Sequence, residues 1–249
     1  EKQEAQDGRI LAYPDYNIRV SSQKNVNGEK FVLRLLKKNA DIIVIKSIEQ
    51  FSNLFNLSAQ YYIEYFRKNK SRVYFLDDNN EALNGYANYP KIIGKLSTYE
   101  IEENDAFVCA IGNPKTKEKC TNMILERGGE FINLIHPKAT IGLNCKMGKG
   151  CIMMPNTLIG QDVTVGDFVT FDGYSSVGHD VHISSYSHFS PFAFVAGGSR
   201  IGLRVMIQPG ARVIIHRTIG DDVTIGVGSV VLRDLKPGIT VFGNPAKQI

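Results

Sequence analysis

Apolar residues in the second half of the chain recur with a period of six. Every sixth position from Ile141 to Val231 is apolar, and the position two residues earlier is small or β-branched except at Arg217. Neither a helix, which repeats every 3.6 residues, nor an alternating strand explains this pattern. It is typical of a short strand and a turn, three of which close one coil, and it predicts a hexapeptide parallel β-helix. The apolar positions are Ile141, Met147, Met153, Ile159, Val165, Phe171, Val177, Ile183, Phe189, Val195, Ile201, Ile207, Val213, Ile219, Ile225 and Val231.

A coil of this kind contains eighteen residues, so positions eighteen apart are expected to stack at one strand spacing, ~4.8 Å. Glycine often follows the apolar position, as at Gly142, Gly160 and Gly178, and we expect it there to ease the corners. Cys145 and Cys151 fall in the small inward column. They are therefore expected to be core residues rather than ligands.

The first half of the chain lacks this period and alternates strand-like and helix-like segments. Asn113 and Pro114 form a plausible N-cap and first residue of a helix that ends before Gly128. Alternating strands and helices indicate an α/β unit with a small Rossmann-like parallel sheet. The expected strands are 42–45, 73–76, 107–111 and 131–135, and the expected helices are 51–66 and 114–127.

Two domains follow from this change of pattern. The α/β domain is expected to occupy residues 1–135, with 1–40 unassigned apart from a possible hairpin within 10–38. The β-helix is expected to occupy residues 136–249, including a tail from Lys236 that departs from the six-residue repeat.

Composition narrows the class of protein. With 43% hydrophobic and 22% charged residues over 249 positions, the chain is typical of a globular protein rather than a disordered one. It contains no apolar run of ~18 residues and opens on no basic-then-apolar leader, so we expect a cytoplasmic protein without a membrane span. A net charge of +4 is too diffuse to indicate nucleic acid. Four cysteines without a CxxC pair indicate free thiols and no metal.

A set of short motifs in a fixed order carries a family resemblance. The chain resembles the sugar O-acyltransferase and nucleotide-amino-sugar N-acetyltransferase family over about residues 70–249. The motifs are FLDD at 75–78, AIGNPKTKEK at 110–119, NLIHPKATIG at 133–142, GHD at 178–180, YSHFSP at 186–191, VAGG at 195–198 and FGNPAK at 242–247.

The resemblance implies an architecture and an activity. Members of this family fold their repeats into a left-handed β-helix, form homotrimers, and bind acetyl-CoA between neighbouring β-helices. They acetylate 4-amino sugars carried on UDP or dTDP, or sialic acid, for bacterial surface glycans. The function expected is N-acetylation of a nucleotide-linked 4-amino sugar, with a nucleotide-sugar-binding-like domain at 1–135.

The same resemblance assigns roles to individual residues. His179 matches the catalytic base, Asp180 the acidic residue beside it, and His188 a second active-site histidine. Gly197 falls where a backbone amide faces the thioester carbonyl. Asp172 falls where a polar side chain meets the sugar. The resemblance also implies coenzyme contacts by Gly198, Ile225, Gly226, Pro245 and Lys247, and nucleotide-sugar contacts by Asp77, Asp78, Gly112 and Asn113.

The six-residue period also predicts where His179 and Gly197 lie, independently of the resemblance. This residue is the second after its apolar position and is predicted to point outward near a corner. Gly197 lies eighteen residues later and should stack above it. Histidine suits a general base because its pKa lies near neutrality, and a backbone amide suits a developing oxyanion. His188 precedes the inward Phe189 and is also expected to face outward, half a coil away.

One departure from the family's pattern leaves the identity of the acetyl acceptor undecided. Relatives follow their first strand with a glycine-rich turn that approaches the nucleotide phosphates, whereas residues 46–55 read KSIEQFSNLF. O-acetylation of a sugar or of sialic acid, and a non-catalytic scaffold role, therefore remain alternatives. A zinc site of the kind found in β-helix carbonic anhydrases is not favoured, because that site needs two histidines five apart and His182 and His188 are six apart.

Overall fold

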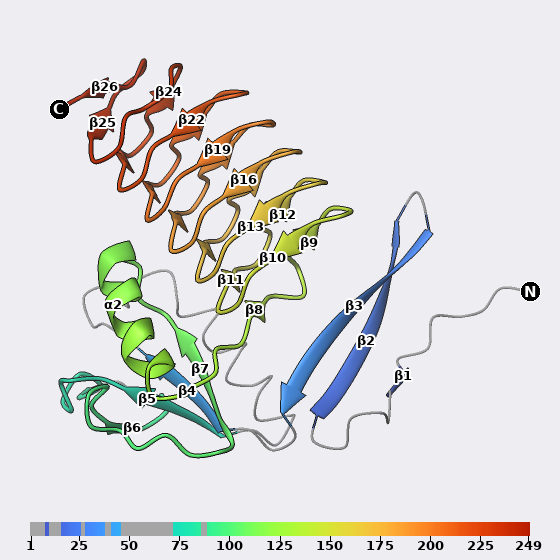
Figure 1. The fold of residues 1–249 in the computed structure, drawn as a ribbon, viewed down its shortest axis with the longest axis vertical. Coiled ribbons are helices and arrows are strands. Elements are labelled where there is room, and N and C mark those ends of the chain that lie inside the picture. The colour runs from blue at the N-terminus through green and yellow to red at the C-terminus, as the bar shows by residue number, and fades with distance from the viewer. Residues whose placement is uncertain (1–7, 10–15, 26–27, 38–40, 46–71, 86–88) are drawn as a thin grey trace, which may run out of the picture.

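The computed structural model describes residues 8–9, 16–25, 28–37, 41–45, 72–85 and 89–249. A small parallel sheet with a helix is followed by a long parallel β-helix, which extends away from it to the C-terminus (Figure 1). The predicted fold class is confirmed. The expected helix at 51–66 and the turn after Ile45 lie outside the described residues.

The N-terminal sheet has four parallel strands in the order β6-β5-β4-β7. Three of them match the expected strands, and the short edge strand β6 was not predicted. Buried aliphatic and aromatic side chains such as Ile43, Leu76 and Phe107 form its core. The strands are β4 (Asp41–Ile45), β5 (Val73–Leu76), β6 (Ile92–Gly94) and β7 (Asp105–Cys109).

The helix α2 (Pro114–Leu125) begins where the sequence predicted and ends two residues earlier. The side chain of Asn113 caps it by accepting a hydrogen bond from the backbone N–H of Thr116, 3.0 Å away. After its last turn the chain reverses at Gly129, where a Cβ atom would collide with Ile124. No side chain larger than hydrogen fits there without a shift.

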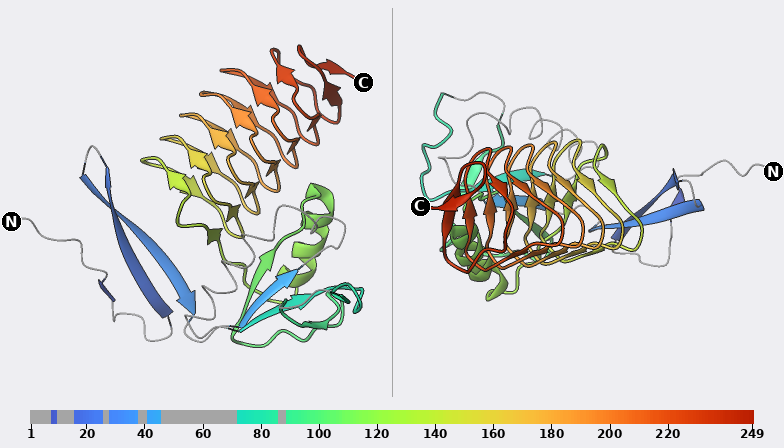
Figure 2. Two further views of the ribbon diagram at one scale, coloured as in Figure 1. Left: turned by 180° about the vertical axis from the view of Figure 1, so that it is seen from behind. Right: turned by 90° about the horizontal axis from the view of Figure 1, so that it is seen from above.

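Antiparallel strands β2 (Tyr16–Asn25) and β3 (Gly28–Lys37) form the predicted hairpin, and the two-residue strand β1 (Gly8–Arg9) pairs with β2. The hairpin lies apart from both the parallel sheet and the β-helix (Figures 1 and 2). Its strands pair with each other without a shift in register from Tyr16↔Lys37 to Asn25↔Gly28.

The β-helix consists of three parallel sheets whose strands pair with residues eighteen positions away, except at the C-terminal end of the long sheet, where Thr224 pairs with Thr240, sixteen positions away. The longest contains seven parallel strands from β8 to β25, which correspond to six turns, and the antiparallel β26 ends it. Its first strand, β8 (Leu134–Ile135), lies just before the expected start at residue 136.

The strands of the long sheet are β8, β11 (Ile152–Met153), β14 (Thr170–Phe171), β17 (His188–Phe189), β20 (Met206–Ile207), β23 (Thr224–Ile225), β25 (Thr240–Phe242) and β26 (Lys247–Gln248). The six-stranded sheet contains β9 (Thr140–Ile141), β12 (Leu158–Ile159), β15 (Ser176–Val177), β18 (Phe194–Val195), β21 (Arg212–Val213) and β24 (Val230–Val231). The five-stranded sheet contains β10 (Lys146–Met147), β13 (Thr164–Val165), β16 (His182–Ile183), β19 (Arg200–Ile201) and β22 (Thr218–Ile219).

The inside of the coil is apolar, as the six-residue period predicted. Stacked anchors such as Phe171 and Phe189 pack with ring centroids 4.8 Å apart. Cys151 is fully buried and Cys145 packs against the same core, and both are free thiols. Their predicted role as core residues is confirmed.

The corners correct one prediction about glycine. The left-handed residue is the third after each apolar position from Ile141 to Ile225, and eleven of these are not glycine, for example Asp180 with φ of 56°. Glycine directly after the apolar position has another cause. A Cβ on Gly160 would lie 2.6 Å from the carbonyl carbon of Gly178 in the next coil. Close approach of successive coils, rather than positive φ, therefore requires glycine in this column.

Helix α2 contacts the same corner in three successive coils (Figure 1). The Lys115 Nζ atom lies 3.7 Å from Asp222 Oδ1, and the Arg204 Nη1 atom lies 3.1 Å from Glu118 Oε2. One turn later, the Tyr186 hydroxyl donates to the Asn122 side chain at 3.4 Å. About one helical turn of α2 separates these contacts on the helix, and one coil separates them on the β-helix. The two spacings are similar, so α2 is held against the β-helix along its length.

The described part of the chain contains no helix that is long and apolar enough to span a membrane.

Candidate active site

The first group of candidate residues lies at the corner between β15 and β16. There the His179 Nδ1 atom is 2.7 Å from the Asp180 Oδ2 atom. Both side chains are about two-thirds exposed, with fractions of 64% and 63%. Asp180 adopts the left-handed corner conformation, which turns its carboxylate back toward the preceding imidazole. The Asp180 carboxylate therefore holds the imidazole of His179 in one orientation on an open surface.

Gly197 stacks on this imidazole, as the eighteen-residue spacing predicted. A Cβ atom on Gly197 would lie 2.8 Å from His179 Nε2 and 2.9 Å from Cε1. The backbone N–H of Gly198 donates to the His179 carbonyl at 2.9 Å. Gly198 has φ of 68°, and a Cβ there would collide with the ring of His216 in the following coil. The rings of His179 and His216 thus occupy the positions that side chains at Gly197 and Gly198 would take.

The second group lies on the outer face of the long sheet. His188 Nε2 is 3.0 Å from Asp172 Oδ2, and both side chains are largely covered. The expectation that His188 faces outward from the coil is met, but it is a buried residue rather than a surface one, because the N-terminal domain packs on this sheet. Its Nδ1 atom is buried and has no hydrogen-bond partner among the described residues.

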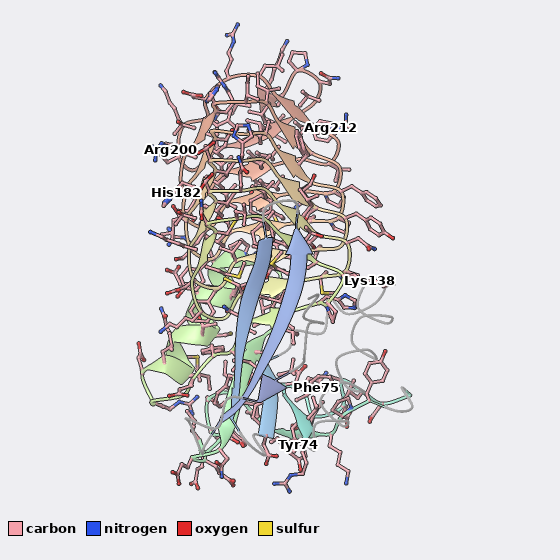
Figure 3. The ribbon with its side chains drawn as sticks, turned by 90° about the vertical axis from the view of Figure 1, so that its right-hand side faces the viewer. Tyr74, Phe75, Lys138, His182, Arg200 and Arg212 are labelled. Carbon is pink, nitrogen blue, oxygen red and sulfur yellow. The ribbon has the colours of Figure 1, made fainter. Side chains whose placement is uncertain are left out.

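No hydrogen bond joins these two groups within the part of the chain that the structure describes. They lie on different sheets, half a coil apart in sequence. His182, three residues after His179, is exposed and stacks under Arg200 on a third face (Figure 3). It has no place in either group.

The third group lies at the carboxyl edge of the N-terminal sheet, where β5 and β7 end. Asp77 is buried; its Oδ1 atom accepts from the backbone N–H of Asn79, and its Oδ2 atom has no partner among the described residues. Asp78 is exposed beside it. Parallel strands bring their carboxyl ends to one edge, so Gly112 and Asn113 lie along this same edge. The Asn113 oxygen, however, is already used in capping α2.

The predicted coenzyme residues of the last coils differ in what they expose. Ile225 is fully buried inside the β-helix, so its side chain offers no surface to a ligand, and a role in binding is limited to its backbone. Gly226 is half-buried, and a Cβ there would lie 2.5 Å from the ring of Phe242. Pro245, which follows a cis peptide bond, and Lys247 are exposed at the end of the β-helix.

The described residues hold no cluster of three or more His, Cys, Asp or Glu side chains that could bind a metal. One residue of interest was missed by sequence reasoning. Lys117 on α2 is 1% exposed, and burial lowers its pKa to about 8. Its helical spacing with the buried Pro114, Thr121 and Ile124 was the available signal.

The N-terminal half matches the family model described as the PglD N-terminal domain over residues 59–124. A GDP-perosamine N-acetyltransferase of Escherichia coli O157:H7 is 32% identical over 149 residues, which cover 57% of this chain and 67% of that protein.

Two groups of solved structures resemble most of this chain. The acetyltransferase domain of PglB from Neisseria gonorrhoeae FA1090 superposes with a TM-score of 0.75 at 28% identity, covering 85% of this chain and 100% of that one. That domain is also known in complex with acetyl coenzyme A. PerB from Caulobacter crescentus, in complex with CoA and GDP-perosamine, gives a TM-score of 0.72 at 27% identity, covering 84% of this chain and 97% of that one.

Together with these likenesses, the small parallel sheet joined to a hexapeptide β-helix identifies the chain as an acetyl-CoA-dependent sugar acetyltransferase. The chain belongs to the PglD-like family of sugar N-acetyltransferases.

Proposed function

We propose that this protein transfers the acetyl group of acetyl-CoA to the amino group of a nucleotide-linked 4-amino sugar, with His179 as general base. The observation that carries this proposal is the His179–Asp180 pair with Gly197 stacked on its imidazole. The likeness to an enzyme known in complex with CoA and GDP-perosamine supports the class of acceptor.

The geometry suits direct attack by the amine. Asp180 accepts a hydrogen bond from Nδ1–H of His179, which leaves the Nε2 lone pair free to accept a proton. The amine nitrogen bonds to the thioester carbon, its proton passes to His179 Nε2, and the carbon–sulfur bond breaks to release CoA. The imidazole packs directly against the Gly197 backbone, so the reacting thioester is expected to approach Nε2 from the exposed side of the ring.

A backbone amide near Gly197 supplies the second requirement of acyl transfer. Amide donors aimed at a developing oxyanion stabilise the transition state by ~2.7–4 kcal/mol. The Gly198 amide is engaged with the His179 carbonyl, so it is not available for this role. The Gly197 amide lies against Gly178 in the coil below and is the candidate donor.

The edge of the N-terminal sheet is proposed to hold the nucleotide sugar. Asp77 supports this assignment because its Oδ2 atom is buried without a partner among the described residues. Burying an unpaired carboxylate oxygen is costly, so a hydroxyl or amide donor from a ligand would be favourable there. Asp172, on the face of the β-helix that the N-terminal domain covers, is proposed to meet the sugar from the other side.

A homotrimer is proposed, with each active site completed by a neighbouring copy. Tyr174 and Phe192 stack at the corner between the long and six-stranded sheets, with ring centroids 5.2 Å apart, although they are 57% and 62% exposed. Phe194 and Leu158 continue this exposed apolar surface along the six-stranded sheet toward the His179 corner. Contiguous apolar surface of this kind is typical of an interface between protein copies.

The first experiment measures acetyl-CoA-dependent thiol release against UDP-, dTDP- and GDP-linked 4-amino sugars, with products weighed by mass spectrometry. One sugar should gain an acetyl mass, and His179→Ala should abolish this gain while acetyl-CoA still binds. His182→Ala is the matched control, because His182 is an exposed histidine in the same coil on another face. Full turnover by the His179 variant would exclude the proposed base.

The other outcomes separate the alternatives. An acetyl ester that hydroxylamine cleaves would indicate O-acetylation. Acetyl-CoA binding without turnover on any of these sugars would indicate an acceptor that carries no nucleotide. Absence of acetyl-CoA binding would contradict the enzymatic role and favour a scaffold.

A further inference from the structure

Lys117 is a buried cation that the proposed reaction does not use. Its Nζ atom donates to the Thr170 hydroxyl at 2.7 Å and to the Phe168 carbonyl at 3.2 Å, both on the β-helix. Lysine is almost never fully buried unless its ammonium group is paired. Here both hydrogen-bond acceptors are neutral oxygens, so the compensating negative charge must come from a neighbouring group.

The neighbouring titratable groups come from three elements. Cys109 at the end of β7 and Cys151 before β11 are buried, and burial raises the pKa of each thiol to about 12. Both therefore remain uncharged at neutral pH. Asp172, two residues after Thr170, is the remaining acidic group that acts on Lys117, and its charge favours the ammonium form.

Asp172 connects this cation to His188. Thr170 and His188 are register partners on the adjacent strands β14 and β17. Thr170 and Asp172 both face outward from the coil, since the Thr170 hydroxyl accepts from Lys117 on α2 and the Asp172 carboxylate contacts the outward-facing His188. The Asp172 carboxylate thus interacts electrostatically with Lys117 and hydrogen-bonds to His188 Nε2 at 3.0 Å.

We propose that Lys117 is a positioning residue that holds Asp172 as a carboxylate and His188 as a neutral imidazole with its proton on Nε2. The ammonium group balances the negative charge of Asp172. Without it, the carboxylate would draw a second proton onto His188 and convert it to an imidazolium. Lys117 would in this way let the N-terminal domain set the protonation state of a histidine on the β-helix.

The test is a histidine titration by NMR on the whole protein with 13C-labelled imidazoles, with His188 assigned by the signal lost in His188→Gln. Lys117→Met keeps the length of the side chain but removes its charge, and it should shift the His188 titration to higher pH. Lys117→Arg should restore the original value. The exposed His179 serves as an internal reference that should not move.

Lys115→Met is the matched control. Lys115 lies two residues earlier on α2, is largely exposed, and pairs with Asp222 rather than with the buried cluster. It should leave the His188 titration unchanged. An unchanged His188 pKa in a folded Lys117→Met protein would overturn the proposal.

A second measurement needs no variant of Lys117. In the unmodified protein, the His188 resonance should report the deprotonation of Lys117 as an inflection near pH 8. Absence of any inflection between pH 7 and 9 would also overturn the proposal. Neither measurement depends on the acetylation assay, so failure to find an acceptor sugar would not affect this inference.

Discussion

Gly197→Ala is the sharpest test of the His179 corner. Its added Cβ would lie 2.8, 2.9 and 3.1 Å from the Nε2, Cε1 and Cδ2 atoms of His179. Ordinary carbon contacts begin near ~3.4 Å, so the ring must move by roughly 0.5–1 Å. The backbone at Gly197 is not left-handed, so alanine is tolerated by the chain itself.

A displacement of about 1 Å from the productive geometry costs on the order of 10²-fold in rate. This corresponds to about 2.7 kcal/mol at 1.36 kcal/mol per factor of ten. We therefore expect Gly197→Ala to lower kcat about 100-fold, while the Tm measured by calorimetry changes little. The assay is steady-state thiol release at saturating acceptor.

The control is Gly173→Ala, at another corner of the β-helix. A Cβ there meets its nearest atom, the Pro155 carbonyl oxygen, at 3.4 Å, which is an ordinary contact. In the double variant Gly197→Ala/His179→Ala, the two losses should be far from additive, because both act through one imidazole. A wild-type kcat in Gly197→Ala would refute this geometry. A raised KM for acetyl-CoA with unchanged kcat would place the methyl group against the coenzyme instead.

Three further outcomes follow from the contacts described above. Asp180→Asn should lower kcat by at least tenfold, because its amide N–H can donate to Nδ1 and hold the imidazole of His179 in the wrong tautomer. His179→Ala should lower kcat further. Arg204→Met should destabilise the protein by about 1–3 kcal/mol in calorimetry at pH 7. This difference should shrink as the pH falls below the unfolded pKa of Asp222, 3.8, because Arg204 lowers the folded pKa of that carboxyl. Lys117 has a pKa lowered from 10.5 to about 8, so the unfolded chain binds the extra proton between these values and stability rises with pH there. Urea titrations of Lys117→Met should lack this rise relative to the unmodified protein.

The register of the β-helix could be predicted from sequence because its two inward columns require apolar or small side chains at fixed positions. The corner conformations could not, since the left-handed residues include Phe168, Tyr174 and Arg204, whose side chains carry no conformational signal. The glycines directly after the apolar positions were predicted to ease the corners, but they are required by close contact between coils. That contact depends on residues eighteen positions away, which the local sequence does not indicate.

The candidate site was predictable only where it depends on the repeat. The stacking of Gly197 on His179 follows from the eighteen-residue spacing alone. The burial of His188 does not, because the side chains that cover its sheet belong to a domain with no periodic relation to it. The roles of the individual site residues remain predictions that the proposed assays address.

The contacts of α2 with three successive corners have a consequence for how this protein can change in length. The seven residue steps from Lys115 to Asn122 rise ~10.5 Å along the helix, and two coil spacings amount to ~9.6 Å. The contacts of the helix are therefore kept only if the β-helix beside it changes by whole coils that preserve the residues at these three corners. Loss of one coil, residues 187–204, would bring Asp222 opposite Glu118, placing two acidic side chains together where an ion pair had been. Coils can be added beyond Asp222 without this conflict, so the β-helix is free to lengthen at its C-terminal end.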